Sequence, residues 1–159
     1  MQEGQLSEGE LDAWRGFLRA HSALVRALDT ELEAEHGLPI TSYDVLINIE
    51  GSEGERMRMR DLADAVLLSR SGLTRLVDRL EKDGLVRREA CPSDARGSFA
   101  CLTDAGRAAL ERARPTHLDG VRRRFLDQLE PGELERLGEI WERIAPGATS
   151  RAKHLTTTD

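Results

Sequence analysis

The sequence predicts a mainly α-helical fold with one small β-hairpin. Apolar residues recur every three or four positions over most of the chain, which is the period of an amphipathic helix. The period changes to two only in LVRREAC (85–91) and SFACLT (98–103), which is typical of short strands. The segment between them, PSDARG (92–97), contains Pro, Asp and Gly and indicates a turn.

The first predicted helix covers residues 7–36. Ser7 and Glu10 have the spacing of a capping box, and Gly37 followed by Pro39 predicts the end of the helix. His21 takes one place where an apolar residue is expected. The apolar positions are Leu11, Trp14, Leu18, Val25, Leu28 and Leu32. At about 1.5 Å per residue such a helix is roughly 43 Å long, so we expect its excess length to pack against a partner subunit.

A second helix is expected to begin after Thr41 or Ser42 and to end before GSEG at 51–54. Beyond it, Met57 and Met59 alternate with arginines, as in a very short strand.

Two short helices and the hairpin follow. The first of them should end near Leu68, and Ser69 is a good N-cap for the second, which should end at Gly84. The inward positions of this second helix are Leu73, Leu76, Val77 and Leu80. Two short helices joined by a tight turn and followed by a hairpin predict a winged helix-turn-helix.

The C-terminal third is predicted to be helical. Thr103 or Asp104 should start a helix over 105–129, in which Pro115 predicts a kink or a break near Arg114.

A last helix should begin at Glu130-Pro131, because proline suits the first helical position. Its apolar stripe is Leu134, Leu137, Trp141 and Ile144. Residues 147–159 have little apolar content and are expected to form a flexible tail.

Composition predicts a soluble globular protein of 159 residues, with one domain or a compact pair of lobes. The acidic amino terminus does not resemble a secretory signal, and the longest apolar run is AVLL at 65–68, so no membrane association is expected. Two cysteines are too few for a disulfide framework, which favours a reducing, cytoplasmic location.

Charge is unevenly distributed along the chain. The net charge is −6, but residues 1–55 hold 3 basic and 12 acidic residues, residues 56–107 hold 11 and 8, and residues 108–159 hold 9 and 9. Only the middle third is basic, and it contains the predicted winged helix-turn-helix. A polyanionic partner is therefore compatible with this part of the chain.

The second helix of the motif presents short polar and basic side chains on its outer face. Arginine can bind guanine with two hydrogen bonds, serine and threonine can reach bases or phosphates, and Gly72 permits close approach of the backbone. Arg79, one turn further on, is better placed for a phosphate. The expected DNA contacts on this helix are Ser69, Arg70, Ser71, Thr74, Arg75 and Arg79.

The hairpin tip is expected to supply a second contact. Arg96, on a turn flanked by glycine, can enter the minor groove, where negative potential is concentrated. Asp94 is expected to pair with Arg96 or another guanidinium and to stiffen the wing.

These residues resemble the multiple antibiotic resistance regulator (MarR) family. The resemblance is carried by LADAVLLSRSGLTRLVDRLEKDGLVRREACPSDARGSFACLTDAG, in particular LVDRLEKDGLVRR, Asp94-x-Arg96 and Leu102-Thr103, and LEPGEL at 129–134 is similar to the start of the family's last helix. The close match covers roughly residues 41–107.

The resemblance implies a homodimeric, ligand-responsive transcriptional regulator, most often a repressor, that binds a pseudo-palindromic site on double-stranded DNA. The half-site centres would lie about 34 Å apart. It implies dimerisation helices at 1–40 and 108–146 around a DNA-binding domain at 41–107. It also implies release from DNA by a small effector, aromatic or anionic, bound between the dimer helices and the DNA-binding domain.

Candidate effector residues are Trp14, His21 and Tyr43, which have polar tips among apolar neighbours on the first two helices. Aromatic and histidine side chains at such positions more often belong to a core, and this alternative stays open.

Other functions are weighed against this one. A winged helix can serve only as a protein-interaction module, although here its outer face is basic. Redox sensing through Cys91 and Cys101 is a further alternative, but a hairpin centred near residues 94–95 puts Cys101 opposite Arg88 and Cys91 opposite Ser98, out of register for a disulfide. The sequence contains no catalytic motif and no paired metal-ligand spacing, so no enzyme, cofactor or metal is expected.

Overall fold

The computed structural model describes residues 5–66, 68–91 and 94–147, with the main chain alone at 94–96. In this part of the chain the α-helices are α1 Glu8–His36, α2 Ile40–Glu50, α3 Met59–Ala65, α4 Arg70–Lys82, α5 Asp104–Arg124 and α6 Glu133–Ile144. The strands are β1 Arg56–Arg58, β2 Val86–Cys91 and β3 Asp94–Leu102, and two short 3-10 helices are η1 Glu53–Glu55 and η2 Leu126–Gln128. The prediction of a mainly α fold with a small antiparallel wing is confirmed.

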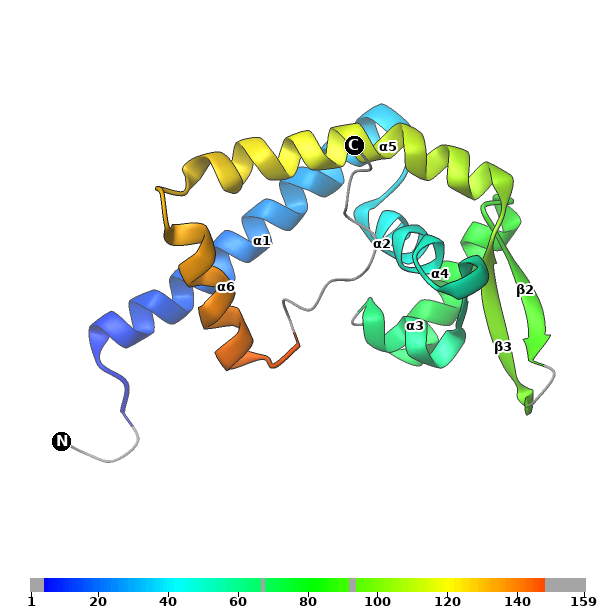
Figure 1. The fold of residues 1–159 in the computed structure, drawn as a ribbon, viewed down its shortest axis with the longest axis horizontal. Helices are drawn as coiled ribbons and strands as arrows, with labels where there is room; N and C mark the ends of the chain where they lie inside the picture. Colours follow the sequence, from blue (N-terminus) through cyan, green and yellow to red (C-terminus); the bar gives the residue numbers. More distant parts are fainter. Residues whose placement is uncertain (1–4, 67, 92–93, 148–159) are drawn as a thin grey trace.

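The long helices α1 and α5 lie side by side and span the molecule (Figure 1). At one end, α2, α3, α4 and the sheet form a lobe, which we call the winged lobe. At the other end, α6 lies against the first half of α1, where the rings of Phe17 and Trp141 are 5.5 Å apart. The winged lobe is thus attached to the rest of the chain through the other ends of α1 and α5.

Helix α1 begins and ends where its sequence predicts. The Ser7 side chain accepts a hydrogen bond from the Glu10 backbone N–H, the Glu10 carboxylate accepts one in return, and Gly37 ends the helix with a φ of 61°. Only Leu28 and Leu32 of this helix are buried. The apolar face of its first half is therefore exposed in the single chain.

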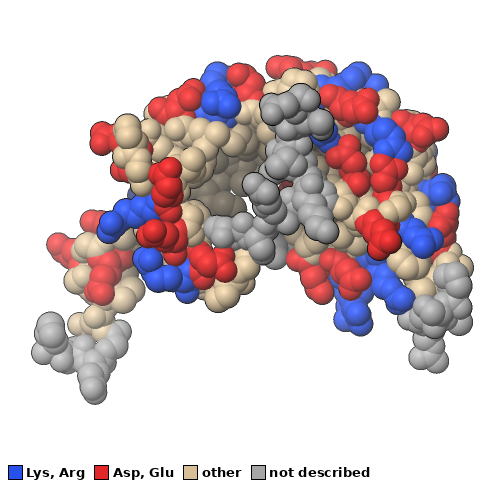
Figure 2. Space-filling model, viewed as in Figure 1, with Lys and Arg blue, Asp and Glu red and all other residues tan. Residues whose placement is uncertain are grey.

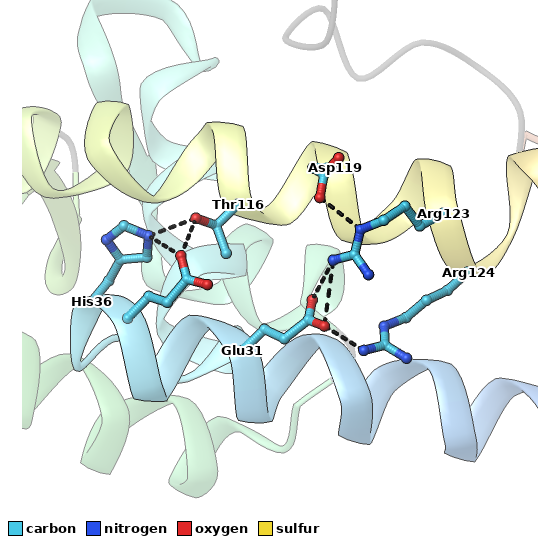
Figure 3. A network of polar contacts seen from close by, with 7 residues as sticks. Glu31, His36, Thr116, Asp119, Arg123 and Arg124 are labelled. Carbon is cyan, nitrogen blue, oxygen red and sulfur yellow. Dashed lines mark hydrogen bonds and ion pairs between the residues drawn. The ribbon is translucent and has the colours of Figure 1, made fainter.

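Polar contacts hold α1 against α5 (Figure 3). Glu31 accepts hydrogen bonds from Arg123 and Arg124, and Asp119 binds the Nε of Arg123 at 2.7 Å. These hydrogen bonds, mainly the one from Arg124, hold the pKa of the Glu31 carboxyl below its usual value. Near the winged lobe, His36 Nε2 lies 2.8 Å from Thr116 Oγ1. The two helices thus contact each other over several turns.

Helix α2 begins at Ile40, two or three residues earlier than predicted. The reason is a tertiary contact, since the Ile40 N–H donates to Asp29 Oδ1 of α1 at 2.8 Å and Pro39 precedes it without a side-chain cap. The core lies mainly between α2, α4, the sheet and the inner ends of α1 and α5. Its largest fully buried side chains are Tyr43, Leu32, Leu46, Ile49, Leu62, Leu73, Leu80 and Leu110.

The wing has one more strand than the predicted hairpin. Strand β1 pairs antiparallel with β3, so the order is β1-β3-β2. Met59 belongs to α3 rather than to this strand, and α3 ends at Ala65, before the predicted limit. A bulge at Ala90/Cys91 changes the predicted register.

The C-terminal helices differ in part from the prediction. Helix α5 continues through Pro115, so there is no break near Arg114. Arg114 binds Glu50 of α2 at 2.5 Å, and Thr116 binds His36, so contacts support the helix on both sides of the proline. The helix ends at Arg124, earlier than predicted.

Helix α6 begins at Glu133 rather than at Glu130-Pro131. Gly132 precedes it with a φ of 88°, a left-handed conformation that glycine adopts readily. The Glu130 N–H donates to Glu133 Oε2 at 2.8 Å, so residues 130–132 form a turn that leads into the helix.

The start of α5 is bonded closely to the start of the wing. Thr103 Oγ1 accepts from the Gly106 N–H at 3.0 Å and lies 2.7 Å from the carbonyl oxygen of Gly84. A Cβ at Gly106 would lie 2.0 Å from the Leu85 carbonyl oxygen, so only glycine permits this approach.

None of the described helices is long and apolar enough to cross a membrane.

Candidate nucleic-acid interface

Helix α4 has one buried side and one exposed polar side. Leu73, Leu76, Val77 and Leu80 are buried in the core. Its exposed side carries Arg70, Ser71, Thr74, Arg75, Asp78 and Arg79. The outward positions that the helical period predicts therefore face solvent, on a helix of 13 residues that starts at the N-cap Ser69.

The first turn of α4 is ordered by its own side chains. Ser69 Oγ accepts from the Gly72 N–H at 3.1 Å and lies 3.3 Å from Ser71 Oγ. Thr74 Oγ1 donates to the Arg70 carbonyl oxygen at 2.8 Å. Near the other end, Arg79 Nη2 donates to Ser42 Oγ of α2 at 3.3 Å, which draws this guanidinium toward α2.

Arg88 of β2 joins the wing to α4. Its guanidinium donates to Asp78 Oδ1 at 2.5 Å, to Glu81 Oε2 at 3.2 Å and to the Thr74 carbonyl oxygen at 3.3 Å. Its backbone N–H donates to Glu81 Oε1 at 3.0 Å. These contacts fix the spacing between helix and wing and neutralise Asp78 on the exposed side. The sequence alone did not identify this role, because it depends on which side chain of β2 faces α4.

A cleft of about 370 Å³ separates α4 from the wing. Its walls include Arg58 and Arg60 at the start of α3, Arg70 of α4, and Gly97 and Ser98 of β3. Figure 2 shows basic side chains along the lower edge of the winged lobe, between α3 and the hairpin tip. Arg58 and Arg60 were not among the predicted site residues; the basic run RMRMR was the only sign of them in the sequence.

The predicted wing contacts fall on the hairpin tip. The main chain of Asp94 and Arg96 belongs to β3, and their side chains lie outside the described part of the structure. Their roles in DNA contact and in stiffening the wing stay predictions.

The cysteines lie on the wing sheet in a different register from the predicted one. Cys101 is opposite Arg87 on β2 and Arg56 on β1, and Cys91 is opposite Asp94. Arg87, the β2 residue opposite Cys101, precedes Cys91 by four positions, which is about 13 Å along the strand. Both cysteines are thiols. Burial raises the pKa of the Cys101 thiol despite the nearby Arg87 and Arg56, and this favours the less reactive protonated form.

The three candidate effector residues lie in two places. Trp14 and His21 flank Phe17 on the exposed half of α1, with ring distances of 5.9 and 6.3 Å. Tyr43 is 1% exposed and belongs to the same core as Leu28. At about 1.5 Å per residue, Leu28 is about 21 Å from Trp14 along α1. Within one chain the structure therefore does not bring Trp14 and Tyr43 together.

Buried polar groups surround Tyr43 where α2 packs on α5. The Tyr43 ring lies 4.5 Å from that of His117, and Tyr43 Oη, His117 Nδ1 and Arg114 Nε make no hydrogen bond within the described part of the chain. Burial raises the pKa of Tyr43 and lowers that of His117. Burial also raises the pKa of Asp44, from an ordinary value of 3.8 to about 6.

The described residues contain no group of three side chains that could hold a metal ion.

Comparison with known proteins identifies relatives along most of the chain. The MarR family profile matches residues 36–97. The uncharacterized HTH-type transcriptional regulator YkoM of Bacillus subtilis is 30% identical over 130 residues, which cover 82% of each chain. Two MarR family transcriptional regulators from Streptomyces coelicolor have similar crystal structures. AbsC is 41% identical with a TM-score of 0.83, covering 89% of this chain and 95% of AbsC. Sco3205, solved in complex with DNA, is 42% identical with a TM-score of 0.85, covering 90% and 93%.

Replacement of Asp44 by Asn is expected to increase stability at neutral pH. Because the pKa is about 6 in the folded chain and 3.8 ordinarily, the folded state binds more protons at this group between those values. The free energy of unfolding therefore falls as pH rises through this window and is constant above it. The advantage of Asp44→Asn should grow from about pH 4 to pH 6 and then level off.

Denaturant unfolding of both chains at a series of pH values measures this difference. Asp64→Asn, at an exposed position of α3, is the matched control for the change in charge. A constant difference between Asp44→Asn and the parent chain across the window would contradict the burial effect.

Proposed function

The chain belongs to the MarR family of transcriptional regulators, and on this basis we propose that it binds double-stranded DNA through α4 and the wing. The observation that carries the proposal is the two-sided α4, whose apolar side is buried while its polar and basic side faces solvent beside an arginine-lined cleft. A helix of about 10–12 Å diameter fits the major groove, which is about 12 Å wide. Sco3205, which has a similar fold, was solved in complex with DNA, and this supports DNA binding by the present chain.

Each predicted contact has a proposed role. Arg70, Ser71, Thr74 and Arg75 lie on the exposed first turns of α4 and would face base edges in the major groove. Ser69 and Arg79, at the start of the helix and further along it, would contact phosphates. Arg96 would enter the neighbouring minor groove, with Asp94 stiffening the wing.

We further propose that the functional unit is a homodimer, an assembly typical of the family. The support is an exposed apolar surface on α1 and α6 in the single chain. It includes Trp14, Phe17, Leu18, Val25, Leu134 and Ile144, together with Leu6 just before α1, and these side chains are 36–69% exposed. Burial of large apolar side chains stabilises by about 1.5–3 kcal/mol each. A second copy would cover this surface and place two α4 helices on one duplex.

The regulator is proposed to be a repressor that a small effector releases. Tyr43 lies where α2, in the winged lobe, packs on α5, so a ligand here could alter the position of the lobe relative to α1 and α5. Trp14 and His21 could join such a site only from the partner of a dimer, because within one chain they lie elsewhere. An effector acts only if it prefers the state that does not bind DNA.

Binding to a fluorescent duplex at two or more salt concentrations tests DNA binding. Affinity should fall steeply as salt rises, because each phosphate contact releases counterions.

Arg75→Ala should weaken binding to the preferred sequence by about 1–3 kcal/mol and reduce base preference. Lys82→Ala, at the other end of α4, is the matched control. Absence of duplex binding would favour a protein-interaction module, and an unchanged base preference in Arg75→Ala would contradict its assigned role.

Effector release can be tested with small aromatic carboxylates, beginning with benzoate, added to the protein bound to DNA. Tyr43→Phe should change the concentration needed for release, because it removes a buried hydroxyl that makes no hydrogen bond to the described residues. His21→Ala should also change it if the partner's α1 completes the site. Identical titration curves for the parent and both variants would remove these residues from the proposed site.

A further inference from the structure

The cleft between α4 and the wing is lined by three arginines from different parts of the fold. Arg58 ends β1, Arg60 lies in the first turn of α3, and Arg70 begins α4. Met59 and Leu73 form part of the same lining. Residues distant in the sequence therefore place three positive charges around one opening.

The charge of this cleft differs from that of its neighbour. None of the described residues that line it is acidic. A larger groove near the outer side of the sheet is also lined by arginines, and Arg58 borders both openings. This groove contains Glu53, Glu55, Asp61 and Glu89 as well. There Arg107 is paired with Glu55 and Arg87 with Glu89. Counted over the described residues, the cleft beside α4 has the one-sided charge that suits a polyanion, and the groove does not.

The shape of duplex DNA indicates what would lie over this cleft. One sugar-phosphate strand separates a major groove from the adjacent minor groove. With α4 in the major groove and the wing in the minor groove, that strand must cross the space between them. Phosphates of a single strand follow each other at about 3.4 Å along the helix axis, so neighbouring phosphates could reach different arginines of the cleft.

Two of the arginines are held by neighbouring side chains. The guanidinium carbon of Arg58 lies 5.4 Å from the centre of the Phe99 ring on β3. Arg60 Nε lies 3.4 Å from Asp61 Oδ1 in an exposed ion pair. Exposed ion pairs contribute little to stability, so a phosphate can replace this one at low cost.

We propose that this cleft binds the phosphodiester backbone of one DNA strand between the two grooves, with Arg58 and Arg60 as phosphate ligands beside Arg70. The inference rests on the proposed binding of DNA by α4 and the wing. It adds a contact site at the start of α3 that the predicted set of DNA-binding residues lacks. Because phosphates are the same in every sequence, this site strengthens binding without selecting bases.

The test compares Arg58→Gln and Arg60→Gln with Arg112→Gln, which removes an exposed arginine from α5 on another part of the surface. Each protein is titrated against a preferred duplex and an unrelated duplex from about 50 to 200 mM salt. Each cleft variant should weaken both duplexes by a similar factor, roughly 3- to 30-fold, and should reduce the salt slope by about one. Arg112→Gln should match the parent chain.

Arg58→Lys keeps the charge and should keep most of the salt slope, so it shows that the positive charge rather than the shape of the guanidinium carries the binding. Thermal unfolding of every variant shows whether the winged lobe is intact. If the parent chain binds with a steep salt slope while both Gln variants behave like Arg112→Gln, the cleft is not a phosphate site. Loss of affinity for the preferred duplex alone would also overturn it, because that pattern indicates base contact. A parent chain that binds neither duplex would instead overturn the proposed function itself.

Discussion

The burial of one side of α4 is the constraint on which the rest of the site depends. Leu73, Val77 and Leu80 are at most 1% exposed, and Leu76 is 8% exposed. At about 1.5–3 kcal/mol for each buried side chain of this kind, rotation of the helix about its axis costs more than a typical single contact with DNA supplies. The polar side is therefore fixed outward before any ligand is present, and binding need not include the cost of orienting the helix.

The second requirement is a fixed position of the wing relative to α4 and α5, and two sets of polar contacts meet it. Arg88 ties β2 to Asp78 and Glu81 of α4. Thr103 and Gly106 tie the start of β2 to the start of α5. Because α5 continues from the wing to the surface on which α1 and α6 lie, a change in helix packing there can be passed to the DNA-binding face. This arrangement gives a physical basis for the proposed effector response.

Local patterns in the sequence predicted those features of the fold that local interactions determine. The capping box of α1, the buried and exposed sides of α4 and the wing strands β2 and β3 depend on residues a few positions apart. The start of α2 was misplaced because Ile40 bonds to Asp29 of α1. At Pro115 the local sequence predicted a kink or a break; α5 has no break, and contacts with α1 and α2 support the helix there.

The candidate site also combines residues that local sequence predicts with residues that only tertiary packing brings together. The exposed residues of α4 follow from helical periodicity, whereas Arg58, Arg60 and Arg88 gain their places from the packing of β1, α3 and β2 around α4. Sequence spacing does not contain that information. Similarly, Trp14 lies on the exposed half of α1, whereas Tyr43 belongs to α2 and packs in the core that includes Leu28, near the other end of α1.

The most direct test of the central claim is selection of bound fragments from a pool of random duplexes, followed by sequencing. If two α4 helices from a dimer read successive major grooves, the selected fragments should share an inverted repeat whose half-site centres are about 34 Å apart, one turn of duplex. Selection of no common sequence, or of a single site without symmetry, would contradict the claim that paired α4 helices read DNA.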